Sequence, residues 1–179
     1  MTANSTSIPV TLLSTPLCID PKGNEGLNPQ KTEPTNPLYS LDKQQSSLVY
    51  YDKNTIVLTM PYWVKVTNSS VEDSEVKKHS FVLSYDPEAM TASDTKLKLY
   101  ISHVVEDAGE TVTRSNFTYA YRAYSIRAAL AAFKEKTGKL PKYLELTAEI
   151  NNSKDELVDK DGKETSVERS VEYDYAFTE

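Results

Sequence analysis

The feature that most constrains the fold is a two-residue alternation of apolar and polar side chains in two neighbouring segments, 79–85 and 96–105. From Phe81 in the first segment and from Leu97 in the second, every second residue is apolar for several positions. Successive side chains of a β-strand point to opposite faces of the sheet. The alternation therefore predicts two strands that each bury one face, paired as an antiparallel hairpin.

Further strands are predicted where β-branched and aromatic residues cluster between turn signals. These strands are expected at 48–51, 56–60, 62–66, 111–121, 144–150 and 166–177, with a bend at Pro61.

One helix is predicted over residues 125–137, with Ser125 as its N-cap and Gly138 ending it. Four apolar residues share one face of this helix at helical spacing, and we expect that face to pack on the sheet. They are Ile126, Ala129, Leu130 and Phe133. The sequence thus predicts an α+β fold that is mainly antiparallel β (a sheet, a sandwich or a small barrel), with one helix packed on it.

An extended arm is predicted over residues 1–40, because six of the nine prolines precede Leu38 among many serines and threonines. Each proline removes one backbone donor, so the arm cannot form a helix. Its apolar stretches could add edge strands to this domain or to a neighbouring copy. The expected anchors are Ile8, Val10, Leu12, Leu13, Leu17 and Ile19. Residues 41–179 are expected to form a single β-rich domain.

Composition narrows the class of protein. The chain of 179 residues is 39% hydrophobic and 26% charged, which is typical of globular proteins. It has no apolar run of membrane-spanning length and no apolar leader, so we expect synthesis in the cytoplasm and no membrane partner. Cys18 is the single cysteine and can form no internal disulfide.

The charged residues are distributed unevenly along the chain. The formal net charge is -6, and the part from Glu145 onward carries 11 acids against 4 bases. Such an acidic third repels phosphate backbones, so nucleic acid is an unfavourable partner, whereas a protein with a basic surface fits.

The histidines are the sharpest candidate for a metal or catalytic site. If Asp86 and Lys96 close the loop, the hairpin register places His79 opposite His103, close enough to share a metal. Both lie on an apolar face, and no acid or cysteine joins them at ligand spacing in the sequence. A core role is therefore preferred, and no metal is expected between them.

Other catalytic patterns give little support. Residues 159–164 resemble a calcium loop in part, but the first ligand position would be Leu157, and Asp161-Gly162 is a turn signal in its own right. The sequence contains no nucleophile elbow and no phosphate-binding glycine loop. Acids of the last two strands could pair as in glycosidases, but solvated acids are the simpler interpretation. They are Glu145, Glu149, Glu168, Glu172 and Asp174. We therefore assign no catalytic, cofactor or metal residues.

The aromatic composition favours an interface. Tyrosine occurs 12 times against four phenylalanines and one tryptophan, and tyrosines and arginines cluster in one segment. Interfaces enrich both residue types. Stacking of bases and simple strand propensity are the alternative explanations. The candidate interface residues are Arg114, Tyr119, Tyr121, Arg122 and Tyr124.

These features predict a non-enzymatic structural protein that assembles with itself through arm exchange, such as a viral or phage coat, tube or decoration subunit. After synthesis in the cytoplasm, such a protein would be incorporated into a virion or another assembly. The first alternative is a small acidic module that binds or inhibits another protein. The second is an enzyme whose site has no recognisable pattern.

Overall fold

The computed structural model describes residues 18–19, 22–23, 36–107, 112–152 and 166–177. The elements are β1 (Cys18–Ile19), β2 (Lys22–Gly23), β3 (Ser47–Asp52), β4 (Thr55–Val64), α1 (Asp73–Val76), β5 (His79–Tyr85), β6 (Lys96–Val105), β7 (Asn116–Ser125), α2 (Arg127–Thr137), β8 (Tyr143–Ile150) and β9 (Val167–Asp174).

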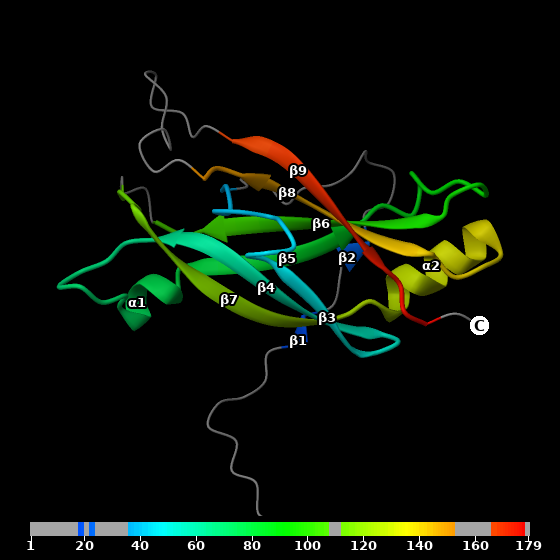
Figure 1. Cartoon of the computed structure of the whole chain (residues 1–179), viewed down its shortest axis with the longest axis horizontal. Coiled ribbons are helices and arrows are strands. Elements are labelled where there is room, and N and C mark those ends of the chain that lie inside the picture. The colour runs from blue at the N-terminus through cyan, green and yellow to red at the C-terminus, as the bar shows by residue number, and fades with distance from the viewer. Residues whose placement is uncertain (1–17, 20–21, 24–35, 108–111, 153–165, 178–179) are drawn as a thin grey trace, which may run out of the picture.

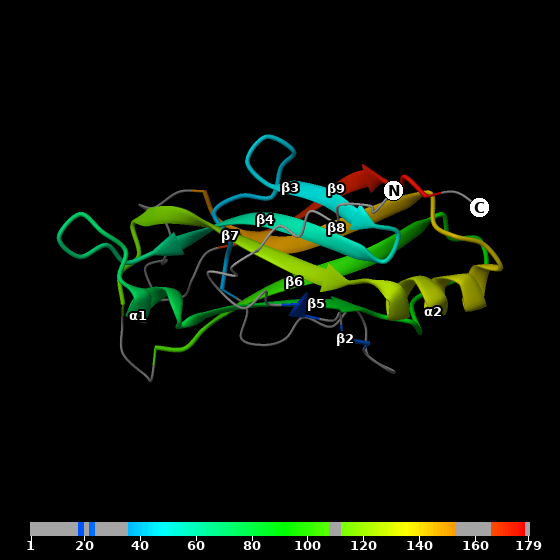
Figure 2. The same ribbon diagram turned by 90° about the horizontal axis from the view of Figure 1, so that it is seen from below.

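The strands form two sheets, one ordered β1-β7-β4-β3 and the other β2-β5-β6-β8-β9. The long pairings are antiparallel except for β6 with β8, which are parallel because β7 and α2 lie between them in the chain. The predicted α+β class with mainly antiparallel strands is confirmed. Figures 1 and 2 show α1 and α2 at opposite ends of the two sheets.

The core lies between the two sheets and is closed at one end by α2. Residues facing inward from both sheets are almost fully buried, among them Leu58, Leu83 and Leu99. The predicted apolar face of α2 is buried as well, with Phe133 wholly enclosed. Gly138 adopts the left-handed conformation, with φ 74°, and ends the helix as expected.

The predicted N-cap is wrong. Ser125 is the last residue of β7, where it pairs with Thr55, and Ile126 occupies the N-cap position. Asn54 accepts a hydrogen bond from the backbone N–H of Ile126 through its carbonyl oxygen, at 2.7 Å. The β3–β4 turn therefore holds the start of α2, and a serine hydroxyl is not used.

The hairpin of β5 and β6 forms as predicted, but its register differs by two residues. Phe81 lies opposite His103, and His79 lies opposite Val105. Asp86 lies beyond the last pair, Ser84 with Tyr100, and its carboxylate accepts hydrogen bonds from the backbone N–H groups of Glu88 and Ala89. The start of β6 pairs with β8, on the edge away from β5. An even offset keeps the same residues facing the core.

The two strands predicted on either side of Pro61 form one continuous strand, β4. Pro61 is tolerated there because β3 begins at Ser47, opposite Thr59, and does not extend beside the proline; on that side the carbonyl of Pro61 accepts a hydrogen bond from the N–H of Tyr39.

Part of the predicted arm belongs to the folded domain. Leu38 is buried and bridges both β4 and β8, and its N–H donates to the carbonyl of Glu149. Because these contacts join the two sheets, the described residues 36–40 of the predicted arm pack with the core. Nearer the N-terminus, β1 pairs with β7 and β2 pairs with β5, both in parallel and both within the same chain.

Candidate functional site

The two histidines meet in the core at the end of the molecule where α1 lies. Nδ1 of His79 is 2.8 Å from Nε2 of His103, and the rings stack with centroids 5.1 Å apart. Nε2 of His79 is 3.2 Å from Oε1 of Glu75. Because an ionised carboxylate only accepts, we infer that Nε2 of His79 carries a proton and that Nε2 of His103 donates to the bare Nδ1 of His79.

An ion network continues from Glu75. Arg114 donates from Nε to Oε1 of Glu75 at 2.7 Å and from two nitrogens to Asp107, each at 2.7 Å. The N–H of Lys65 also donates to Glu75. We call Glu75, His79, His103, Asp107 and Arg114 the histidine cluster.

The charges of the cluster follow from these contacts. Burial opposes ionisation of Glu75, but hydrogen bonds from Lys65 and Arg114 outweigh it and lower the pKa of its carboxyl. The Arg114 guanidinium likewise lowers the pKa of Asp107. Burial lowers the pKa of His79, and burial together with the neighbouring His79 ring lowers the pKa of His103 to about 3. Both rings are therefore neutral at neutral pH.

The geometry suits a structural cluster better than a catalytic one. His103 is 2% exposed, and its Nδ1 has no hydrogen-bond partner. In the tautomer inferred above, Nδ1 of His103 carries no proton and can only accept a hydrogen bond. Within the described ranges, no group of three or more histidine, cysteine or acidic side chains could hold a metal ion.

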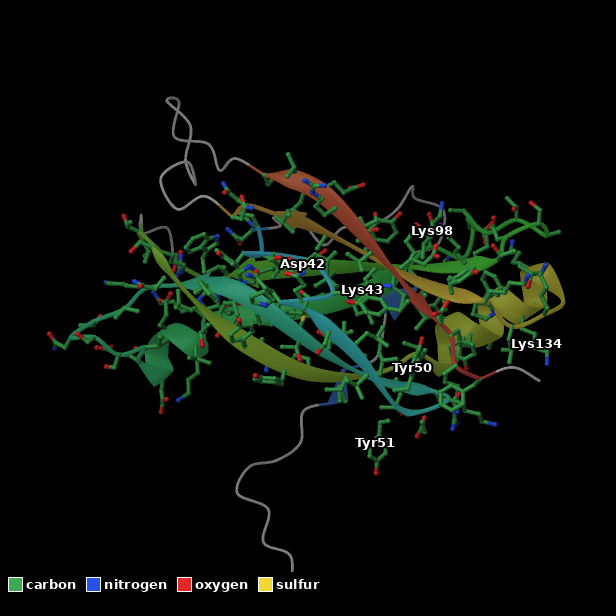
Figure 3. All side chains as sticks on the ribbon, viewed as in Figure 1. Asp42, Lys43, Tyr50, Tyr51, Lys98 and Lys134 are labelled. Atoms are coloured by element: carbon green, nitrogen blue, oxygen red, sulfur yellow. The ribbon has the colours of Figure 1, made fainter. Side chains whose placement is uncertain are left out.

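The second candidate site is the outward face of the four-stranded sheet. Five of the seven large hydrophobic side chains that are exposed in the described structure lie on its strands β3 and β7. We call them the outer aromatic face: Val49, Tyr51, Phe117, Tyr119 and Tyr121. Tyr51 and Tyr121 are the most open, at 81% and 65% exposure, and Figure 3 shows Tyr51 pointing away from the body of the protein.

The strand register makes this face continuous and almost free of charge. Tyr121 of β7 lies opposite Thr59 of β4, which lies opposite Ser47 of β3. The register also aligns Val57 with Val49. Asp52, which the bulge of β3 sets opposite Thr55 at one end of the face, is the one charged residue among the described outward positions of β3, β4 and β7, although a quarter of the whole chain is charged.

An aromatic cluster extends the outer aromatic face toward residue 39. The ring of Tyr39 stacks on Phe117 with centroids 4.1 Å apart and meets Trp63 edge to face at 5.1 Å. Trp63 donates from Nε1 to the carbonyl of Asn151 at 2.7 Å. These contacts fix the side chains at one end of the face.

The structure divides the candidate interface residues that the sequence indicated. Tyr119 and Tyr121 lie on the outer aromatic face. Tyr124 is fully buried and donates to the carbonyl of Phe81, so it is a core residue and not part of a surface. Arg114 is held in the histidine cluster, with a side chain 11% exposed.

Arg122 points inward between Ala120 and Tyr124, with its guanidinium 5.4 Å from the centre of the Phe81 ring. Of the arm anchors, Ile19 lies in β1 beside Tyr124. Ile8, Val10, Leu12, Leu13 and Leu17 lie outside the described residues.

The acids of β8 and β9 face one another as pairs. Glu145 lies opposite Glu172, and Glu149 lies opposite Glu168. Lys96 bridges the first pair, with its Nζ 3.3 Å from Glu145 and 2.5 Å from Glu172. This ion network resembles a solvated sheet surface more than a catalytic pair. The resemblance of residues 159–164 to a calcium loop lies outside the described residues.

Val49, Tyr51 and Phe117 are not among the interface residues predicted from the sequence. The signal was present, because Phe117, Tyr119 and Tyr121 alternate with period two and therefore share a face. Counting tyrosines and arginines together obscured it, since Arg122 and Tyr124 belong to the opposite face.

The described residues thus define a two-sheet α+β protein with a buried histidine cluster and an aromatic face that is almost free of charge. No protein-family model and no curated protein matches the chain. Among solved structures it is similar to a Bacteroides fragilis protein described as a "putative lipoprotein", with a TM-score of 0.67 and 27% identity over 94% of this chain and 75% of that chain.

Two further structures show weaker likeness. One is an uncharacterized protein from Parabacteroides merdae, with a TM-score of 0.48 and 12% identity over 89% of this chain and 67% of that chain. The other is a protein of unknown function from Bacteroides vulgatus, with a TM-score of 0.43 and 9% identity over 89% of this chain and 59% of that chain. Neither adds to the argument. No helix of the described residues is long and apolar enough to cross a membrane.

Proposed function

We propose that this chain is a non-enzymatic structural protein that associates with a second copy of itself through the outer aromatic face. The observation that carries the proposal is the placement of five exposed hydrophobic side chains on one sheet face whose single charged residue, Asp52, lies at its end. Exposed apolar patches of this kind on soluble domains commonly mark protein interfaces. Tyrosine suits them because it buries a large area and keeps a polar tip.

The distribution of charge favours a second copy over a basic partner. The chain carries a net charge of -6, and like charges brought together by self-association would repel. A face with a single charge at its end avoids most of that repulsion and offers little to a basic surface. A symmetric dimer uses the same patch on both subunits, which a neutral aromatic patch satisfies without a complementary charge pattern.

The predicted arm would strengthen such an assembly. In the described structure β1 adds to β7 within one chain. The same two-residue addition could be made by the arm of a neighbour, because strand addition depends on backbone hydrogen bonds and not on which chain supplies the strand. Fold similarity to a bacterial protein gives no support to a viral coat, so the proposal is restricted to self-association.

The test is the mass in solution by light scattering over a range of concentrations. The unaltered chain should have at least twice the mass of one chain. The Tyr51→Ser/Tyr121→Ser variant should shift toward single chains while keeping its circular dichroism spectrum. Val167→Ser is the matched control, because Val167 is an exposed apolar residue on the other sheet.

Two outcomes would overturn the proposal. An unaltered chain that is monomeric at every concentration rules out self-association, and salt-sensitive capture by a basic protein would then favour the acidic binding module. A double variant that assembles as well as Val167→Ser would show that the outer aromatic face is not the interface. Deleting residues 1–35, which stops before the buried segment, separates the contribution of the arm.

A further inference from the structure

A pocket of about 400 Å³ lies between α2, the β3–β4 turn and the segment after β9. Three cationic side chains reach it, those of Lys53, Arg127 and Lys134, while Tyr175 and Phe177 form its apolar wall. No acid is among the described residues that line it. Figure 3 labels Lys134 on α2, at this end of the molecule. The volume is within the range of small-molecule sites.

Hydrogen bonds between the surrounding segments hold the pocket in shape. The hydroxyl of Tyr175 donates to the carbonyl of Lys53 at 2.7 Å. The N–H of Ile126, directly before α2, donates to the carbonyl of Asn54 at 2.7 Å. The turn, the helix and the C-terminal segment are therefore tied together on the three sides of the pocket, so a ligand would meet a preformed site.

The apolar wall is ordered by aromatic packing. Tyr50 meets Tyr175 edge to face at 5.8 Å and Phe177 at 5.5 Å between ring centroids. The hydroxyl of Tyr50 donates to the carbonyl of Asp174 at 2.9 Å, which fixes the ring that supports the other two. Such ring geometry is the preferred one for aromatic pairs.

The positive charge of the pocket contrasts with the acidic chain. Asp52, the acid next to Lys53 in sequence, is not among the lining residues; its carboxylate accepts a hydrogen bond from the N–H of Asn54 at 2.7 Å, and its charge adds to burial in raising the pKa of Tyr175. Lys53 of the β3–β4 turn and Arg127 of α2 both line the pocket. Cations beside an aromatic wall match a ligand that carries one negative charge on an apolar body.

We propose that this pocket binds a small amphipathic anion, an organic acid whose carboxylate lies against Lys53 and Arg127 and whose aliphatic body lies against Tyr175 and Phe177. The site is separate from the outer aromatic face and does not depend on self-association. Binding involves no covalent step.

Calorimetric titration with decanoate tests the proposal. Decanoate should bind once per chain. Decanol, which has the same body without the charge, should bind at least about tenfold more weakly, because a hydrogen bond to a charged group contributes about that factor. Acetate, which has the charge without the body, should also bind at least about tenfold more weakly, because it buries almost no apolar surface. Equal binding of decanoate and decanol would overturn the proposal.

Two pocket variants test whether decanoate binds in this pocket. Lys53→Gln/Arg127→Gln should weaken decanoate binding by about tenfold or more. Ala131→Glu adds an acid at an exposed position of the pocket and should abolish binding without altering the core. Lys65→Gln is the control, an exposed lysine outside the pocket. Decanoate binding that survives both pocket variants, in proteins that melt like the control, would overturn the assignment.

Discussion

The Nδ1 atom of His79 lies 2.8 Å from the Nε2 atom of His103, with both rings buried. The sequence placed these residues opposite each other, whereas the observed register sets them two residues apart on the same inward face. They still meet because diagonal neighbours on one face of a hairpin remain within reach of long side chains.

The first prediction concerns pH. An unfolded histidine titrates near pH 6.5, while the pKa of buried His103 is held at about 3. Between these two pH values the unfolded state binds more protons than the folded state, so acidification lowers the free energy of unfolding. The stability that the neutral His103 ring contributes is therefore fully present above pH 6.5 and is lost as the pH falls below it. Through the shifted pKa of His103 alone, the free energy of unfolding should fall by roughly 2 kcal/mol when the pH is lowered from 7 to 5. Urea denaturation at both pH values measures the loss.

A variant separates the histidines from the carboxylates. Glu75 and Asp107 also have lowered pKa values, so their contributions are lost only in more acid solution, below the pKa of an unfolded carboxyl group. His103→Gln should therefore be less stable at pH 7 and lose less stability on going to pH 5. A variant as sensitive to pH as the unaltered chain would count against the buried neutral pair.

The second prediction concerns Arg114. Its guanidinium is the partner of both Glu75 and Asp107 at one end of the sheets. Arg114→Met leaves the buried carboxylate of Glu75 without a cation, while Asp107 retains Lys78, and it should lower the free energy of unfolding by roughly 3–5 kcal/mol. Chemical denaturation at neutral pH is the measurement. Arg169→Met, an exposed arginine of β9, is the matched control and should change stability by less than about 0.5 kcal/mol.

Double replacement refines this prediction. Glu75→Gln/Arg114→Met removes the uncompensated charge and should recover part of the stability lost by Arg114→Met. If the double variant is no more stable than the single one, Glu75 is not the carboxylate that requires Arg114.

The third prediction separates two tyrosines of β7 that the sequence could not tell apart. The hydroxyl of Tyr124 donates to the carbonyl of Phe81 at 3.1 Å in the core. Tyr124→Phe should cost about 1 kcal/mol, because it leaves a buried carbonyl with one partner fewer. Tyr121→Phe, on the exposed face, should leave the melting temperature unchanged. Equal effects of the two replacements would contradict the assignment of their faces.

The elements that the sequence predicted well are those with strong periodicity. Residues 79–85 and 96–105 match β5 and β6, and the helix expected at 125–137 begins only two residues later, because Ser125 completes the last pair of β7. Register could not be predicted, since β6 pairs with β8 as well as with β5, and Tyr143, the partner of Lys96 in β8, lies 47 residues further along the chain (143 − 96). Local patterns contain no information about such pairing.

The candidate surface was only partly predictable for a related reason. The exposure of Tyr121 and the burial of Tyr124 follow from alternation once the strand is known to run to Ser125. The predicted strand ended at residue 121, so Arg122 and Tyr124 were grouped with Tyr119 and Tyr121 as candidate interface residues without an assignment to a face. The participation of Arg114 in a buried network depends on Glu75, which lies 39 residues earlier, and no local spacing indicates it.

The last prediction concerns Leu38, which the sequence assigned to the arm. Its side chain is 1% exposed, and its backbone bonds to β8 while bridging to Tyr62 of β4. Leu38→Ala removes a buried side chain where the two sheets meet, so it should cost about 2–5 kcal/mol, whereas Val49→Ala on the exposed face should cost less than about 1 kcal/mol. Thermal and urea unfolding of both variants measure the difference. If residue 38 belonged to an extended, proline-rich arm outside the core, Leu38→Ala would leave the free energy of unfolding unchanged. A Leu38→Ala protein as stable as Val49→Ala would therefore return residues 36–40 to the arm and move the start of the domain beyond them.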